Sequence, residues 1–173
     1  MNPWLIQAVG FVGMVMCIGS FQFKDTKKLL FFQMTGNFVY VIQFILLGAY
    51  SGCAVLVFQV LSNLPLCLEK PDKRAWNGLK WFFVAAIVIA SALTWSNWFS
   101  IFPAAGAVAS VLSSWSRNGK LIRLAKLFVV GPGWLIYDVY ARTAAGILSE
   151  LFALCSTLIS IYRYGLNDLS KTD

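Results

Sequence analysis

The sequence predicts an all-α membrane protein with seven transmembrane helices, and three observations point to that fold. Hydrophobic residues make up 59% of the 173 residues and charged residues only 12%, whereas soluble domains carry roughly 25% charged residues. The apolar runs are continuous and close to the roughly 20 residues that a helix needs to cross a bilayer. Basic residues gather in alternate loops, as in a chain that crosses a membrane repeatedly.

Three helices are expected in the first part of the chain, over residues 4–23, 29–49 and 53–68. Gly10, Gly13 and Gly19 on the first helix would let another helix approach closely in lipid. We therefore expect these glycine faces to pack against helices of the same chain or of a second copy in a homo-oligomer.

A hydrophilic connection over residues 69–80 separates this part from the rest, and a linking helix is expected over 81–95. Three further helices are expected over 102–115, 121–140 and 143–164. The predicted organisation is one membrane domain over 1–173. Its parts are a three-helix repeat (1–68), a loop with the linker helix (69–98), a second three-helix repeat (99–164) and a tail (165–173).

The positions of Lys and Arg predict the orientation, because these residues concentrate on the cytoplasmic side of a membrane. All 14 except Arg142 lie in or beside the first, third and fifth loops or after the last helix. This predicts the amino terminus outside and the carboxyl terminus inside. The net charge of +7 then follows from topology and from contact with an anionic inner leaflet, so we expect no nucleic-acid partner.

The two groups of three helices would cross the membrane in the same direction, a parallel 3+1+3 arrangement. Gly13 with Gly106, Lys24 with Arg117 and Lys27 with Lys120 match at one constant spacing. After a short gap, residues 36–40 resemble residues 133–137. Transporters are often built from such repeats, with the binding site at the repeat interface.

Polar side chains share one face of the second predicted helix. Gln33, Asn37 and Tyr40 are spaced four and three residues apart, so they lie on the same side of a helix, with Gln43 close to that side. With Gln59 and Asn63 of the third helix they could line a hydrophilic cavity that binds a substrate. They could equally serve as interhelical hydrogen bonds, which such residues often make in membrane bundles.

The sixth predicted helix contains Gly131, Pro132 and Gly133, which predict a helix break and a hinge. Trp134 follows within the span, whereas the other tryptophans fall at predicted interfaces.

Trp134 shares a helix face with Tyr137 and Asp138. These three residues could form an aromatic platform with a carboxylate for a nucleoside-like or sugar-like ligand. The alternative is a tryptophan packed in the core of the bundle, with Asp138 near the outer interface.

Glu150 lies roughly 9 Å into the last predicted helix, at a rise of about 1.5 Å per residue. A carboxylate at mid-membrane costs on the order of 3 kcal/mol, so it should be paired or protonated. Arg142, across the preceding turn, is the predicted partner, and it could also pair with Asp138 four residues before it. The alternative is that Glu150 is a proton-coupling site.

Other chemistry has little support in the sequence. The chain has no His, which removes the commonest metal ligand. Cys17, Cys53, Cys67 and Cys155 are scattered singly and are interpreted as small packing residues. Nucleophile and phosphate-binding motifs are missing, so we expect no enzymatic activity, no cofactor and no metal.

The chain resembles the YgjV-type family of bacterial inner membrane proteins over nearly its whole length. The resemblance lies in residues 9–23, 44–50 and 134–163. It implies a bacterial inner membrane location but no substrate. A more distant similarity, through the Trp-x-x-Tyr element of Trp134 and Tyr137, is to PnuC-type vitamin transporters. The 3+1+3 plan is shared with them and with SWEET-type sugar transporters.

The sequence thus favours a transporter or binding protein for a small polar solute, such as a vitamin, nucleoside or sugar. Two three-helix bundles would rock about a site at the midplane of the bilayer. The alternative is a non-transporting membrane protein that acts through protein partners or through oligomerisation.

Overall fold

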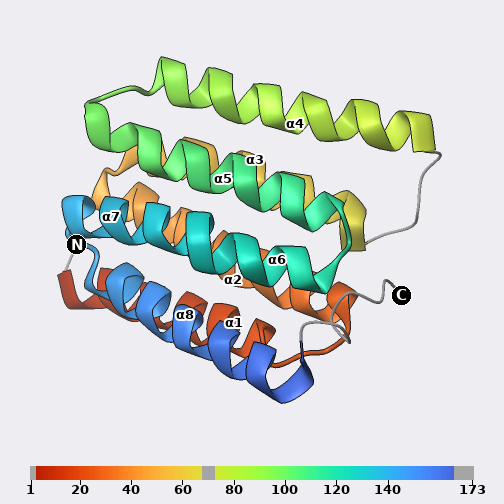
Figure 1. Cartoon of the computed structure of the whole chain (residues 1–173). Helices are drawn as coiled ribbons and strands as arrows, with labels where there is room; N and C mark the ends of the chain where they lie inside the picture. The colour runs from red at the N-terminus through yellow and green to blue at the C-terminus, as the bar shows by residue number, and fades with distance from the viewer. Residues whose placement is uncertain (1–2, 68–72, 166–173) are drawn as a thin grey trace.

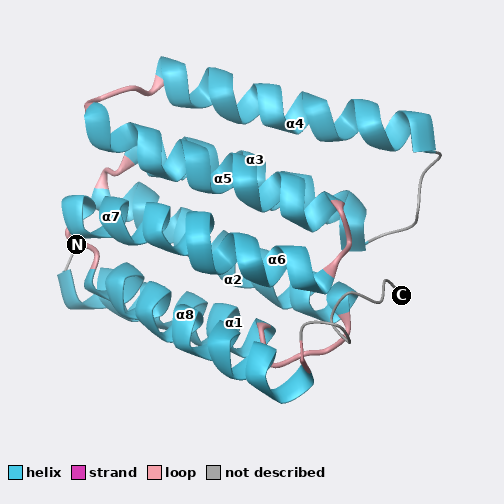
Figure 2. Cartoon of the chain, viewed as in Figure 1, coloured by secondary structure: helices cyan, strands magenta, loops and turns pink. Residues whose placement is uncertain are grey.

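A computed structural model describes residues 3–67 and 73–165, and every regular element in those ranges is a helix (Figures 1 and 2). The all-helical prediction is therefore confirmed for the described residues. The elements are α1 (Pro3–Ser20), α2 (Thr26–Leu47), α3 (Tyr50–Cys67), α4 (Lys73–Leu93), η1 (Trp98–Ser100), α5 (Ile101–Trp115), α6 (Gly119–Ala125), η2 (Lys126–Val130), α7 (Gly131–Ala141) and α8 (Ala144–Tyr164).

Six described segments are long and apolar enough to cross a membrane, and Trp4–Ser20 is a shorter apolar helix. The six are Thr26–Leu47, Tyr50–Cys67, Trp76–Leu93, Trp98–Trp115, Gly119–Ala141 and Ala144–Tyr164.

The helices form two layers of three, with α4 along one edge (Figure 1). One layer contains α1, α2 and α3, and the other contains α5, the continuous α6–η2–α7 segment and α8. Across the layers α3 packs on α5 and α1 packs on α8, while α4 packs on both α3 and α5. The six helices form a closed ring in the order α1, α2, α3, α5, α7 and α8, and the two middle helices, α2 and α7, face each other across it.

Short polar residues set the helix ends at the turns. Asp25 caps α2 by accepting a hydrogen bond from the Lys27 amide at 2.8 Å, and Asn118 caps α6 through the Lys120 amide at 3.0 Å. Such side chains satisfy amides that the first helical turn leaves unpaired. At the other end, α2 stops at Gly48 in the left-handed conformation, which glycine adopts without steric cost.

The linking helix α4 begins eight residues earlier than predicted, so part of the predicted connection is helical. The prediction followed the charges at Lys73, Arg74 and Lys80, but charged residues do not oppose helix formation outside the apolar layer. The added turns carry Trp76, whose ring lies 4.4 Å from that of Trp115 between centroids.

The predicted helix break at Gly131 is wrong, because the helix runs on from Gly119 to Ala141. It contains instead a wider π turn over Lys126–Val130, in which the Gly131 amide donates to the Lys126 carbonyl. Pro132 then lies in the first turn of α7, where its missing N–H is tolerated. The wider turn thus absorbs the proline without interrupting the helix.

Glycines on this segment and on α1 are contact points between helices. A Cβ on Gly133 would lie 2.9 Å from the Phe102 carbonyl oxygen, and one on Gly13 would lie 3.0 Å from the Gly36 carbonyl oxygen. Gly10 packs directly on the Gln43 side chain, whereas Gly19 faces open space. The faces of Gly10 and Gly13, considered above for oligomerisation, are thus occupied within the chain.

Candidate functional site

A small polar cavity lies between the two layers, bounded by the middle helices α2 and α7 and by α1, α3 and α8. Its free space is ≈ 40 Å³, enough for a few water molecules and well below the roughly 300–1,000 Å³ of typical ligand pockets. The predicted site residues that line it are Asn37, Tyr40, Gln59, Trp134, Asp138 and Glu150. The structure thus brings together candidates that are far apart in the sequence.

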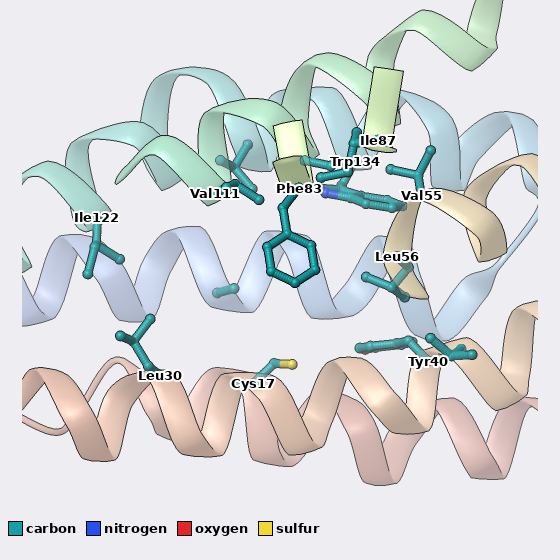
Figure 3. Close-up of a cluster of buried hydrophobic side chains, with 14 of the residues drawn as sticks. Cys17, Leu30, Tyr40, Val55, Leu56, Phe83, Ile87, Val111, Ile122 and Trp134 are labelled. Atoms are coloured by element: carbon teal, nitrogen blue, oxygen red, sulfur yellow. The ribbon is translucent and has the colours of Figure 1, made fainter. Parts of the chain in front are cut away.

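Aromatic side chains from the two layers meet in this cavity. Figure 3 shows Tyr40 and Cys17 on one side and Trp134 on the other. Phe44 of α2 stacks on Trp134 of α7, with ring centroids 6.2 Å apart and an interplanar angle of 15°. Trp134 is 6% exposed, so it is a buried wall of the cavity rather than an interface anchor.

The prediction that Glu150 pairs with Arg142 is wrong. Lys126 Nζ lies 2.6 Å from Glu150 Oε2, with both side chains largely buried. Arg142 is exposed and caps the end of α7 in the left-handed conformation, which takes its side chain out of the helical position that a pair with Asp138 requires. A buried charge is stable only when it is paired, and Lys126 meets that need from the π turn.

Asp138 is 4% exposed and lines the cavity near the start of α8. Its Oδ1 accepts a hydrogen bond from the Thr143 hydroxyl at 2.9 Å. A Cβ on Gly146 would come within 2.6 Å of the same oxygen, so the carboxylate lies against the first turn of α8. The partial positive charge of a helix amino terminus favours an anion there.

Two polar atoms on the cavity wall lack hydrogen-bond partners among the described residues, the Tyr40 hydroxyl and Gln59 Oε1. The Ser149 side chain lies near the Tyr40 hydroxyl, but the two groups do not form a hydrogen bond of acceptable distance and angle. Gln59 donates its amide to Ser110 at 2.9 Å, which leaves its carbonyl oxygen free. Buried polar atoms are rarely left unpaired, so the cavity is suited to a further polar species.

Several predicted residues lie outside the cavity. The Tyr137 hydroxyl bonds to Ser51 at 2.7 Å and accepts from the Gly52 amide at 2.9 Å, which ties α7 to the start of α3. Asn63 is buried, and neither of its amide atoms has a partner within the described residues. The glycine–proline segment at 131–133 also does not line the cavity.

Sequence reasoning missed Lys126, Cys17 and Ser149 as cavity residues, whereas Gln33, which it placed on the face that could line a cavity, does line it. The distribution of basic residues predicts Lys126 in or beside the fifth loop, whereas the structure places it on the cavity wall. The sequence contained a signal that Lys126 lines the cavity. The constant spacing that matches Lys27 with Lys120 also matches Gln33 with Lys126.

Arg123, one turn before Lys126, is fully buried and holds together the end of the bundle at which α1 ends and α6 begins. Its guanidinium donates to Ser160 Oγ at 2.9 Å and to the carbonyls of Gly119 at 3.1 Å and Phe23 at 3.0 Å. Like Lys126, it had been expected to lie at the membrane surface. It links α6 to α8 and to the turn that follows α1.

The family model described as Imp-YgjV, bacterial inner membrane protein, matches residues 4–168. Neither the curated proteins nor the solved structures contain a match to the chain. The family match therefore covers the cavity and every helix around it.

Proposed function

This chain belongs to the Imp-YgjV family of bacterial inner membrane proteins, and from that premise we propose that it transports or binds a small polar solute in the central cavity. The observation that carries the proposal is the composition of the cavity wall. Asn37, Tyr40 and Gln59 come from the first three helices, and Trp134 and Asp138 come from the last three. A site shared between two helix bundles is where repeat-built transporters bind their substrates.

We further infer that α1–α3 and α5–α8 are two equivalent halves. Asp25 and Asn118 cap α2 and α6 at the spacing already noted for Lys27 and Lys120. At that spacing the Ser20 hydroxyl bonds to the Cys17 carbonyl at 2.6 Å and the Ser113 hydroxyl to the Ser110 carbonyl at 3.0 Å.

Beyond the π turn the equivalent positions are one residue further apart. Gly48 and Arg142 both end their helices in the left-handed conformation, and their amides bond to the carbonyls of Ile45 at 3.1 Å and Val139 at 3.2 Å. A π turn holds one extra residue, which accounts for the change. The match of residues 36–40 with 133–137 has a different spacing, so it does not belong to this correspondence.

The proposed mechanism is alternating access by relative movement of the two halves. The cavity of ≈ 40 Å³ must enlarge before it can hold a vitamin, nucleoside or sugar. Contacts between halves hold both ends, through Tyr137 with Gly52 and through Arg123 with Phe23. A solute would enter when one of these sets opens, and the π turn offers a place for α7 to bend.

Seven membrane crossings and a cytoplasmic carboxyl terminus are part of the proposal. The start of α1 and the end of α8 lie at opposite ends of the bundle (Figure 1), which supports an odd number of crossings. The turns at 21–25 and 116–118, which carry or adjoin basic residues, lie at the same end as the end of α8. This supports a cytoplasmic assignment for that end.

Thermal unfolding of the purified chain with a panel of vitamins, nucleosides and sugars tests the proposal. We expect at least one solute to raise the unfolding temperature, since a ligand that binds the folded state stabilises it. Trp134→Ala should abolish the shift, and Trp98→Ala, at a residue 80% exposed, should retain it. A panel with no active solute, or equal loss in both variants, would contradict the proposal.

A further inference from the structure

The charged residues of the cavity all come from one half of the chain. Lys126, Asp138 and Glu150 line it from η2, α7 and α8. At the spacings described above, the first half has Gln33, Phe44 and Leu56 in the equivalent lining positions. The two halves therefore build one cavity from matching positions, but the second half alone gives it charge.

One acidic group of the cavity has no basic partner of its own. Lys126 pairs with Glu150 at 2.6 Å, so an ionised Asp138 would have no full positive charge beside it. The titratable groups that face Asp138 are Glu150, Lys126, Tyr40 and Tyr137, and the basic group among them is already engaged. The amino terminus of α8 supplies only a partial positive charge, equivalent to about half an elementary charge.

Oxygen atoms without partners lie across the cavity from Asp138, on helices of the first half. The Tyr40 hydroxyl and Gln59 Oε1 belong to side chains that are 7% and 4% exposed, and neither oxygen has a partner among the described residues. An amide oxygen can only accept hydrogen bonds or bind a cation. Gln59 Oε1 could therefore be satisfied by a positively charged species or by a hydrogen-bond donor, and the Tyr40 hydroxyl could bind either of these or an acceptor.

We propose that this cavity binds a singly charged cation beside Asp138, either an alkali ion or the ammonium group of the solute. The inference rests on the proposed function, because it assigns a charge to the occupant of the same site. One positive charge neutralises Asp138, and oxygen atoms are the ligands that hard cations prefer. The space of ≈ 40 Å³ accepts a small cation with a water molecule before the bundle opens.

A proton on Asp138 is a weaker solution to the same charge imbalance. It would neutralise the carboxylate and supply one donor, whereas Gln59 Oε1 would still need a donor of its own. A cation can contact several oxygen atoms at once. The proton is therefore the competing occupant that the test must distinguish from a cation.

The test measures the unfolding temperature of the purified full chain at constant ionic strength and pH. N-methylglucamine chloride, whose cation is too bulky for the cavity, is replaced in separate arms by sodium, potassium, ammonium or methylammonium chloride. We expect a saturable rise in at least one arm. Response to sodium or potassium identifies an alkali ion as the occupant, and response to the ammonium salts alone identifies an ammonium group.

Variants connect the response to the site. Asp138→Asn should abolish the rise, and Asp25→Asn, which replaces one helix cap by an equally good one, should keep it. Tyr40→Phe removes only a hydroxyl that has no described partner, so it should fold and should weaken the response several-fold. It keeps the inference testable if Asp138→Asn does not fold.

A parallel series in N-methylglucamine chloride lowers the pH without adding any other cation. The inference would be overturned by no response to any cation, by an equal response in Asp138→Asn, or by stabilisation through acidification alone, which would assign a proton. Neutral solutes that stabilise the chain through Trp134 without any cation would overturn this inference and leave the proposed function intact. A response to a cation with no response to any solute in any salt would support the cation site and contradict the proposed function.

Discussion

Lys126 Nζ lies 2.6 Å from Glu150 Oε2, and this contact joins the π turn of the Gly119–Ala141 segment to α8 on the wall of the central cavity. The pair is largely buried, so each charge depends on the other for compensation. Its place in the cavity makes it both a structural tie within the second half and part of the proposed binding site.

Breaking this pair should destabilise the protein more than removing it altogether. We expect Lys126→Ala or Glu150→Ala to lower the free energy of unfolding by roughly 3–5 kcal/mol, because each removes one partner of a buried ion pair. The double variant Lys126→Gln/Glu150→Leu installs the residues of the equivalent positions in the first half. It should recover most of the loss in a denaturant titration, and a double variant as unstable as the sum of the singles would contradict this account.

Replacing Arg142 should not destabilise the protein, in contrast to breaking the Lys126–Glu150 pair. Its φ of 55° places it in the left-handed region, which costs a non-glycine residue about 1–2 kcal/mol. Arg142→Gly, which copies Gly48 of the first half, should leave the free energy of unfolding unchanged or raise it by up to about 1 kcal/mol. A marked decrease would mean that the Arg142 side chain stabilises Asp138 or Glu150 after all.

Arg123 should not tolerate replacement by lysine. The guanidinium reaches Ser160, Gly119 and Phe23 at the same time, and an ammonium group cannot match that planar set of donors. We expect Arg123→Lys to lower the free energy of unfolding by more than about 2 kcal/mol. Arg163→Lys, at an exposed residue, is the matched control and should change it little.

Orientation can be measured by cysteine labelling in a variant that lacks the four native cysteines. Ser116→Cys, in the turn between α5 and α6, should react with an impermeant thiol reagent only from the cytoplasmic side. Ser96→Cys, in the turn before α5, should react only from the outside. The reverse pattern would overturn the proposed topology.

The fold class could be predicted because long apolar runs and caps such as Asp25 act locally along the chain. The polar face of α2 was also visible, since Asn37 and Tyr40 follow helical periodicity. The partner of Glu150 could not be predicted. It depends on the π turn, which places Lys126 beside α8, and on the left-handed end of α7, which turns Arg142 away. Arg142 was the predicted partner because it is close to Glu150 in the sequence, whereas helix packing brings Lys126 to Glu150 in the structure.

The start of α4 illustrates a similar limit. Hydropathy locates the segment that fits inside a bilayer, but it does not locate the end of a helix that continues into water. Trp76 contacts Trp115, and this contact stabilises the part of α4 that the charges at Lys73, Arg74 and Lys80 led us to expect in a connection.

Accessibility of the cavity from both sides of the membrane tests the central proposal most directly, and it requires no knowledge of the solute. Ser149→Cys, in the cysteine-free background, places a thiol on the cavity wall, and Leu148→Cys places one on the exposed face of α8. Alternating access predicts that a charged, impermeant thiol reagent modifies Ser149→Cys in right-side-out and in inside-out vesicles but leaves Leu148→Cys unmodified in both. Modification of Ser149→Cys from one side only, or from neither, would contradict transport through this cavity.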